Sequence, residues 1–302
     1  MSTHQLHFDA LPSLGTFYRQ ALFSRKPGLK PGESIPEIHA SVSPLIPDPE
    51  HVVLYREVCG LLDDGKLPLC YPHVLAAPLH FAILMAKPFP FKALGLVHVS
   101  NQVVAYRPIN AGERLEVRTW VAGQREAPRG LLFDLKTRIR VEDEVVWESI
   151  STIIRIQKSK GGVPRKNRGI SPGGIAADPS RTAVWRIKED TGRRYARPSG
   201  DFNPIHLTPW SAKLFGFKRA IAHGMWSLAR CLGECEKELP STPLHLDVAF
   251  KRPIFLPSRV LFSSYQEESG VRFGLHSVDG VKPHLQGAIR NFDNAAPFLD
   301  DC

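Results

Sequence analysis

Residues Tyr195–His206 read Tyr-Ala-Arg-Pro-Ser-Gly-Asp-Phe-Asn-Pro-Ile-His, and the rest of the chain is best understood from this stretch. Gly200 allows backbone angles that other residues avoid. Pro204 fixes its own φ and keeps the residue before it out of the helical region. The segment is therefore predicted to be a tight turn, on which the side chains of Asp201 and His206 can converge.

A carboxylate and an imidazole that converge in a cleft can act as a general acid–base pair. Asp and Asn beside Gly and Pro are also ordinary turn formers, so the Ser-Gly-Asp piece alone means little. A second run makes the pattern more specific: residues Gly216–Met225 read Gly-Phe-Lys-Arg-Ala-Ile-Ala-His-Gly-Met and open a predicted apolar helix. Together the two runs favour a functional site over a plain turn.

These two runs resemble the MaoC-like hydratases, which include the R-specific enoyl-CoA hydratases and related 3-hydroxyacyl dehydratases. The resemblance in motif covers residues Tyr195–Met225. It implies a hot-dog fold, in which an antiparallel sheet wraps a long helix. It also implies (R)-specific hydration of trans-2-enoyl-CoA to 3-hydroxyacyl-CoA, or the reverse dehydration, on coenzyme A or an acyl carrier protein.

The resemblance also suggests roles for individual residues. Asp201 and His206 would hold and polarise one water molecule and supply the proton. The N–H of Gly224, at a helix start, would stabilise negative charge on the thioester oxygen. Asn203 is expected to hold the turn or orient His206, and Ser199 to hydrogen-bond within the loop.

Substrate-binding roles are predicted for Ser199, Asn203, His223, Lys251 and Arg252. Two of these predictions have plainer alternatives. His223 would equally suit a packed, hydrogen-bonded position at a helix start. The Lys251–Arg252 pair could meet carrier phosphates, although a basic pair at a strand end is more often simply solvated. No metal or redox cofactor is needed, and coenzyme A enters only as part of the substrate.

Composition limits the class of protein. The chain has 302 residues, of which 43% are hydrophobic, and this suits one large or two medium domains. No apolar run is long enough to span a bilayer, and the first residues show no secretory signal. The five cysteines are an odd number without a disulfide-like spacing, which favours a reducing cytoplasm. Cys231 and Cys235 would share one helix face and are expected to pack in the core.

The net charge of +9 is concentrated in part between residues 158 and 168. Lys158, Lys160, Arg165, Lys166 and Arg168 stand there with no acid among them, in a Gly- and Pro-rich segment. We interpret this segment as a solvated basic linker rather than a nucleic-acid site. A basic surface would also attract a phosphate-bearing acyl carrier such as coenzyme A.

Hydrophobic periodicity predicts the remaining elements. In the first half it predicts helices at 16–22, 52–62 and 78–85, followed by strands at 96–106, 113–122, 131–141 and 145–156. In the second half it predicts a strand at 182–187, a short helix capped by Asp190 and ending near Ala196, helices at 209–215 and 221–239, and strands at 244–250, 259–267, 271–278 and 284–292.

The two halves resemble each other, which indicates a duplication. Each has an apolar helix followed by a strand that ends in Arg-Pro-Ile, at 107–109 and at 252–254. Pro72-His73-Val74 stands where the second half has Ala222-His223-Gly224. We therefore predict an α+β double hot dog. Its parts are a degenerate N-terminal unit at 1–157 that shapes the acyl pocket, a basic linker at 158–180, and a catalytic unit at 181–302.

One active site per chain is expected, because the first half lacks the Gly-Asp-x-Asn-Pro-x-His pattern and Asp63 and Asp64 have no histidine at the right distance. Two alternatives stay open: a thioesterase, since hot-dog folds host several chemistries, and a catalytically silent carrier-binding subunit. A calcium loop, a serine-hydrolase elbow and nucleotide-binding loops are disfavoured because their patterns are incomplete or missing. We expect a homodimer that binds neither nucleic acid nor a membrane.

Overall fold

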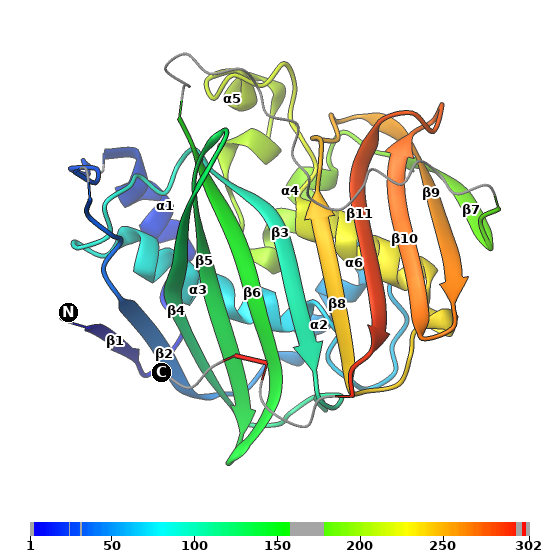
Figure 1. The fold of residues 1–302 in the computed structure, drawn as a ribbon, viewed down its shortest axis with the longest axis horizontal. Helices are drawn as coiled ribbons and strands as arrows, with labels where there is room; N and C mark the ends of the chain where they lie inside the picture. Colours follow the sequence, from blue (N-terminus) through cyan, green and yellow to red (C-terminus); the bar gives the residue numbers. More distant parts are fainter. Residues whose placement is uncertain (1–2, 24, 31, 158–177, 294–297, 300–302) are drawn as a thin grey trace.

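The computed structural model describes residues 3–23, 25–30, 32–157, 178–293 and 298–299 (Figure 1). Most of the predicted linker at 158–180, including its five basic residues, lies outside the described residues. One continuous sheet of 11 strands crosses the molecule in the order β1-β2-β4-β5-β6-β3-β8-β11-β10-β9-β7. Apart from the parallel pair β1–β2, neighbouring strands are antiparallel.

The strands of the first half are β1 (His4–Phe8), β2 (Ile38–Leu45), β3 (Leu96–Ala105), β4 (Leu115–Ala127), β5 (Gly130–Val141) and β6 (Glu144–Ile156). Those of the second half are β7 (Arg181–Ile187), β8 (Leu244–Phe250), β9 (Ser258–Glu267), β10 (Gly270–Ser277) and β11 (Pro283–Asn291). The α-helices are α1 (Leu14–Phe23), α2 (Pro49–Cys59), α3 (Tyr71–Met85), α4 (Thr191–Ser199), α5 (Pro209–Lys213) and α6 (Gly224–Glu234). Two short 3-10 helices are η1 (Pro204–His206) and η2 (Glu236–Glu238).

The sheet order shows the duplication directly. From its centre outward the first half runs β3-β6-β5-β4-β2 and the second half runs β8-β11-β10-β9-β7. The two central strands pair antiparallel, with Gln102 opposite Asp247, so the halves are related by an approximate two-fold axis between them. The predicted double hot dog is confirmed.

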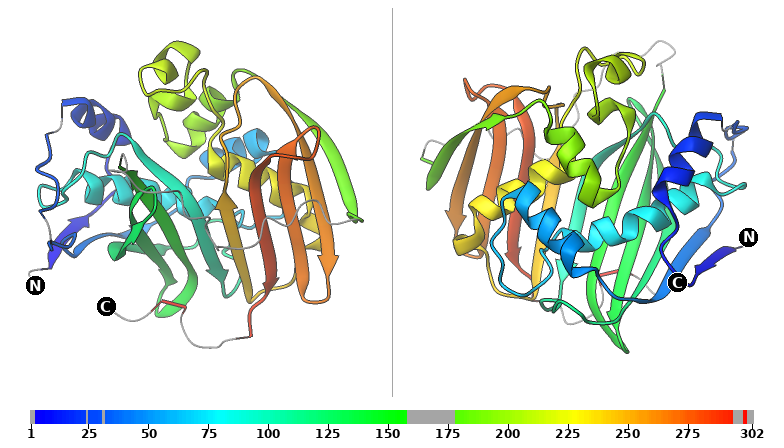
Figure 2. Two further views of the ribbon diagram at one scale, coloured as in Figure 1. Left: turned by 45° about the horizontal axis from the view of Figure 1, so that its top comes forward. Right: turned by 180° about the vertical axis from the view of Figure 1, so that it is seen from behind.

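The main helices α3 and α6 lie on one face of this sheet, and α2 lies with them (Figure 2). The face of α6 against the sheet is apolar and buried, with Leu228 0% and Ala229 1% exposed. One continuous hydrophobic core includes residues of both halves. Burial of this apolar surface is the main favourable term that holds sheet and helices together.

Three predicted helix boundaries were wrong. The helix predicted at 78–85 is α3, which begins at Tyr71, so Pro72 rather than Pro78 occupies its first turn. The helix predicted at 221–239 is α6, which begins only at Gly224. The residues before it are extended and pair with the segment that follows β8. Helix α2 ends at Cys59 because Gly60 adopts a left-handed conformation, with φ 67°.

Periodicity missed two strands, β1 and β2, and misjudged one cap. Strand β2 is the counterpart of β7, but the prolines around it at 36, 44 and 47 give it the composition of a loop. Asp190 does precede α4, but its backbone is already helical and its side chain makes no capping hydrogen bond.

Cys231 on α6 and Cys235 at its C-cap are both 0% exposed and are free thiols, so the prediction that they pack in the core is confirmed. Within the described parts of the chain, no helix has the length and apolar character needed to cross a membrane.

Candidate active site

The loop after α4 is held by its own side chains. Asn203 caps η1 by accepting a hydrogen bond from the N–H of Ile205. The Ser199 hydroxyl donates to the Tyr195 carbonyl and accepts from the N–H of Asp201. These short-range bonds satisfy backbone groups that the turn would otherwise leave unpaired. They agree with the roles predicted for Asn203 and Ser199 within the loop.

His206 is 8% exposed at the end of η1, and its hydrogen bond determines which nitrogen is free. Its Nδ1 lies 2.8 Å from the carbonyl oxygen of Ile221. A carbonyl oxygen can only accept, so Nδ1 carries the proton and Nε2 keeps its lone pair. No hydrogen bond joins Nε2 to any described residue, which leaves this nitrogen available to take a proton from a substrate or a water molecule.

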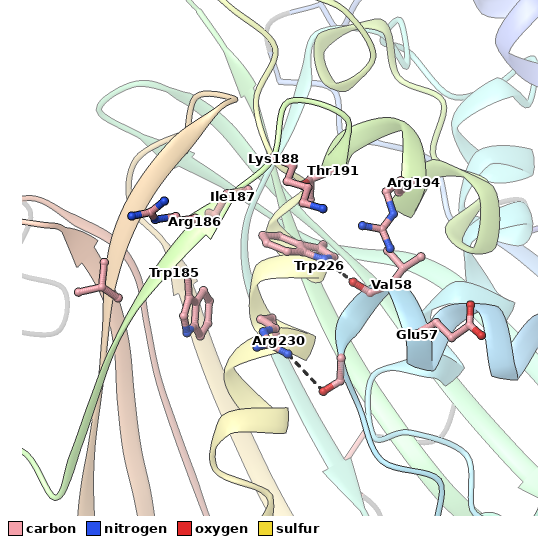
Figure 3. A pocket seen from close by; sticks show the side chains of 12 residues that line it. Glu57, Val58, Trp185, Arg186, Ile187, Lys188, Thr191, Arg194, Trp226 and Arg230 are labelled. Carbon is pink, nitrogen blue, oxygen red and sulfur yellow. Dashed lines mark hydrogen bonds between the residues drawn. The ribbon is translucent and has the colours of Figure 1, made fainter.

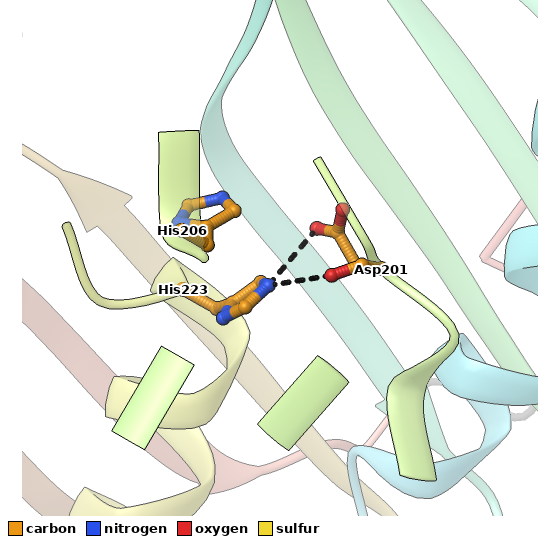
Figure 4. Close-up of side chains that lie close together, drawn as sticks. All are labelled: Asp201, His206 and His223. Carbon is orange, nitrogen blue, oxygen red and sulfur yellow. Dashed lines mark hydrogen bonds and ion pairs between the residues drawn. The ribbon is translucent and has the colours of Figure 1, made fainter. Parts of the chain in front are cut away.

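His223 stands at the N-cap of α6 and stacks on His206, with ring centroids 3.7 Å apart. Its Nε2 donates to the backbone carbonyl of Asp201 at 2.9 Å and lies 3.7 Å from that residue's Oδ2 (Figure 4). The alternative interpretation of His223, as a packed and hydrogen-bonded residue at a helix start, is therefore what the structure shows. It holds the loop at Asp201 and covers the imidazole of His206.

The Asp201 side chain is 40% exposed, whereas the His223 side chain is 3% exposed, so the centre opens to solvent at the carboxylate. Its Oδ1 accepts from the Tyr18 hydroxyl at 2.6 Å and from the Asn203 N–H at 3.1 Å. Burial alone would raise the pKa of Asp201, but His223, His206 and these hydrogen bonds outweigh it and hold that pKa below its usual value.

Burial lowers the pKa of His206, although Asp201 and the bond to Ile221 oppose this effect. At neutral pH the centre therefore combines an ionised carboxylate with a neutral imidazole whose Nε2 is unprotonated. The two side chains are brought together as predicted. They can hold one water molecule between them and remove its proton, which is general acid–base chemistry.

Gly224 is the first residue of α6, where backbone N–H groups have no partner within the helix. A Cβ at this position would lie 2.9 Å from the ring of Phe250, so only glycine fits beside that ring. The N–H of Gly224 thus lies at the positive end of a helix beside an apolar side chain.

Asp201, His206 and His223 each offer a ligand atom, and these atoms lie within 4.8 Å of one another, a spacing that a metal ion could also use. Two details favour acid–base chemistry instead. The Nε2 of His223 carries a proton that it donates to a carbonyl. The two imidazoles are also stacked with 27° between their planes, so their lone pairs do not converge on one point.

Sequence reasoning missed three residues of the first half that bond to Asp201 or feel its charge: Tyr18 of α1, His73 of α3 and His98 of β3. The charge of Asp201 affects the pKa of His73 and of His98, which places both in its electrostatic field. The rings of His73 and His98 stack at 5.6 Å, and each has one buried nitrogen without a partner among the described residues. The only available signal was the alignment of His73 with His223.

The other predicted site residues lie elsewhere or act structurally. Lys251 and Arg252 follow β8 and are exposed, with no ion pair to any described residue. Asp63 and Asp64 pair with Arg56 in the loop after α2, which is consistent with a structural role.

A separate groove of 390 Å³ lies between α2, β7, α4 and α6 (Figure 3). It does not include Asp201 or His206. Its rim carries Arg186, Lys188 and Arg194, which are exposed and have no acidic partner in the described parts of the chain. The groove is also lined by Glu57 and by Arg230, which pairs with Glu234, so its unpaired positive charge comes from the three exposed side chains at its rim.

The buried histidines predict that the protein loses stability in mild acid. Burial lowers the pKa of His73 to about 4 and those of His98 and His223 to about 3. In the unfolded chain a histidine titrates near 6.5, so between about pH 6.5 and 4 the unfolded state binds more protons. Stability is therefore complete above pH 6.5 and falls as pH decreases, by up to about 1.4 kcal/mol per pH unit for each such group.

Thermal unfolding followed by circular dichroism between pH 7.5 and 4.5 checks this prediction. The variant His98→Gln is the informative comparison, because it removes one of these groups and should flatten the dependence of Tm on pH. A wild-type Tm that stays constant from pH 7 to 5 would contradict the expected burial of neutral imidazoles.

The fold defines a double hot-dog protein in which one loop of the second half brings Asp201 and His206 together. Comparison with known proteins agrees. The family model "MaoC like domain" matches residues 174–287. The chain is 34% identical over 259 residues to 3-hydroxyacyl-thioester dehydratase X of Mycobacterium tuberculosis. This match covers 85% of this chain and 91% of that protein. The crystal structure of HtdX of M. tuberculosis superposes with a TM-score of 0.73 at 33% identity, covering 84% of this chain and 100% of that one.

A shorter match joins residues of this chain to the (R)-specific enoyl-CoA hydratase of Aeromonas caviae, with 38% identity over 69 residues, 22% of this chain and 52% of that protein. The chain therefore belongs to the MaoC-like dehydratase family, and it is an enzyme of the hydro-lyase class.

Proposed function

We propose that this enzyme catalyses the (R)-specific hydration of trans-2-enoyl thioesters to 3-hydroxyacyl thioesters, and the reverse dehydration. The observation that carries the proposal is the placement of an ionised Asp201 carboxylate and the unprotonated Nε2 of His206 in one partly open centre. The named relatives, a 3-hydroxyacyl-thioester dehydratase and an (R)-specific enoyl-CoA hydratase, support the same chemistry.

In the proposed mechanism, a water molecule is held between Oδ2 of Asp201 and Nε2 of His206. As its oxygen bonds to C3 of the enoyl group, one water proton passes to this pair, and the electrons of the C2–C3 double bond move toward the thioester. The N–H of Gly224 stabilises the negative charge that develops on the thioester oxygen. The pair then delivers a proton to C2, so the catalytic groups return to their starting state without a metal or redox cofactor.

The surface around the centre supports an anionic acyl carrier. Between Thr191 and Ala229 the only acidic residue is Asp201, whereas the basic residues are Arg193, Arg194, Arg197, Lys213, Lys218 and Arg219; Arg230, which follows, pairs with Glu234. This positive field would attract the phosphates of coenzyme A or an acidic acyl carrier protein. Lys251 and Arg252 are proposed to contribute to it. A homodimer, a cytoplasmic location and the lack of nucleic-acid binding stay predictions.

A direct assay tests this function. The purified chain is mixed with crotonyl-CoA and longer enoyl-CoAs, and the loss of enoyl absorbance is followed together with free thiol. We expect the absorbance to fall without thiol release, the product to be the (R)-3-hydroxyacyl-CoA on chiral analysis, and dialysis against a chelator to leave the rate unchanged. Thiol release would identify a thioesterase, and no change of either kind would indicate a silent carrier-binding subunit.

A further inference from the structure

Helix α1 of the first half reaches the catalytic loop of the second half. The Tyr18 hydroxyl donates to Oδ1 of Asp201 at 2.6 Å, across 183 positions of sequence. The Tyr18 ring packs against Phe81 of α3, with centroids 4.6 Å apart. One turn earlier, Leu14 lies so close to Gly200 that a Cβ there would be 2.3 Å from its Cδ1. Helix α1 is thus in contact with α3 on one side and with the catalytic loop on the other.

The contact between Tyr18 and Asp201 bears on the orientation of the carboxylate. The terminal torsion of an aspartate is broad, so the group rotates unless its oxygens are held. Here Oδ1 accepts both the Tyr18 hydroxyl and the Asn203 N–H, and Oδ2 is left facing His223. Of these two donors, only the Asn203 N–H belongs to the same loop as the carboxylate. The tyrosine hydroxyl is the contact that ties Asp201 to a different part of the molecule.

We propose that Tyr18 is a positioning residue for Asp201, which holds the carboxylate so that Oδ2 faces the reacting water. The active site is then built from both halves of the chain. This inference rests on the proposed function, because it assumes that Asp201 is catalytic. It gives the first half a role in catalysis, although the family match at 174–287 contains no part of α1.

The chemistry of a phenol suits this role. Burial and the nearby Asp201 charge raise the pKa of Tyr18 far above its usual value, so the hydroxyl stays protonated and always donates. A hydrogen bond to the ionised carboxylate favours that form. Titratable groups from several elements act on Asp201 or feel its charge: Tyr18 of α1, His73 of α3, His98 of β3, Tyr195 of α4, His206 of η1 and His223 before α6.

The variant Tyr18→Phe tests the proposal, because it keeps the ring against Phe81 and removes only the hydroxyl. We expect kcat for crotonyl-CoA to fall by about 10- to 100-fold, the usual effect of losing a hydrogen bond to a charged group, with KM changed by less than about threefold. The carboxylate loses a donor that lowers its pKa, so the acidic limb of the kcat/KM–pH profile should move to higher pH. The lost bond should also lower Tm by several degrees, so the shift of the pH profile, which a purely structural role would not produce, is the decisive measurement.

Tyr265→Phe is the matched control, since the Tyr265 hydroxyl is buried without a partner among the described residues. It should leave kcat and the pH profile unchanged. A Tyr18→Phe enzyme with a wild-type kcat and pH profile would overturn the positioning role. The positioning role would also be overturned if Tyr18→Phe lowered kcat by the same factor in an Asp201→Asn background. A group that acts through Asp201 has no carboxylate left to position there.

The two proposals fail in different ways. If Asp201→Asn keeps wild-type activity, the proposed mechanism itself is wrong. If Asp201→Asn is inactive while Tyr18→Phe behaves as the wild type, only the positioning role is lost.

Discussion

Replacing Asp201 by Asn is expected to lower kcat/KM for crotonyl-CoA hydration by about 10³-fold, within the range typical of a general acid–base group. An amide has nearly the shape of the carboxylate and can still accept from Tyr18 and Asn203, so the loop should keep its conformation. It cannot take a proton from water, however. Initial rates of enoyl absorbance loss measure the effect, and far-ultraviolet circular dichroism checks the fold.

A double variant makes this test sharper. If Asp201 and His206 act together on one water molecule, Asp201→Asn/His206→Gln should be no slower than the worse single variant, since residues that work as a unit are not additive. If the rate losses of the two single variants multiply in the double variant, the two groups serve separate steps.

Asp63→Asn is the matched control in the first half. Its side chain is 73% exposed and pairs only loosely with Arg56, at 3.5 Å. Activity should stay within about twofold of the wild type, as expected for an exposed carboxylate that has no contact with Asp201 or His206. A loss as deep as that of Asp201→Asn would contradict one active site per chain.

Replacing Glu148 by Ala is expected to lower the free energy of unfolding by about 3–5 kcal/mol. Glu148 is 0% exposed on β6 and its Oε1 accepts from Nε of Arg138 at 2.7 Å. Its Oε2 accepts from the Tyr106 hydroxyl and from the N–H groups of Phe298 and Leu299. Removing the carboxylate takes one buried charged partner from Arg138 and leaves several donors that pointed at it unsatisfied.

Thermal and urea unfolding measure this loss, which should appear as a Tm lower by roughly 10 °C. Glu144→Ala is the control on the same strand, because its carboxylate is 58% exposed in its pair with Arg107 and should contribute less than about 1 kcal/mol. Equal effects of the two substitutions would show that burial of the Glu148 carboxylate adds nothing. The residual hydration rate of folded Glu148→Ala should be unchanged, since Glu148 has no contact with the centre.

Most elements of the fold could be predicted from the sequence, and the errors have physical causes. Strand β8 was predicted with its observed bounds, since alternating residues in Leu244–Phe250 match its buried face and its partly buried face. Strand β2 was missed because prolines gave it the composition of a loop. The predicted start of helix α3 was too late. An apolar helix that is buried on nearly all sides has little periodicity from which its start can be located.

The chemistry of the centre was also readable, because the residues that shape it are close in sequence. Gly200, Asn203 and Pro204 determine a turn through their own backbone preferences and short-range hydrogen bonds. That turn carries Asp201 and His206, and the run ending in His223-Gly224 supplies the helix start. The free nitrogen of His206 was not readable, since it depends on a bond to Ile221, fifteen positions away.

The sequence by itself determined the turn that carries Asp201 and His206 and indicated the duplication, because these depend on local patterns of turns and alternation. The double hot dog followed from the family resemblance that the same residues carry. Only the tertiary structure decided that Tyr18 bonds to the carboxylate and that His73 and His98 lie within reach of its charge. These residues lie more than one hundred positions before Asp201, and they reach it because β3 and β8 pair at the centre of one sheet and α1 packs over the catalytic loop. Side chains brought together by such long-range packing share no spacing along the chain from which their meeting could be predicted.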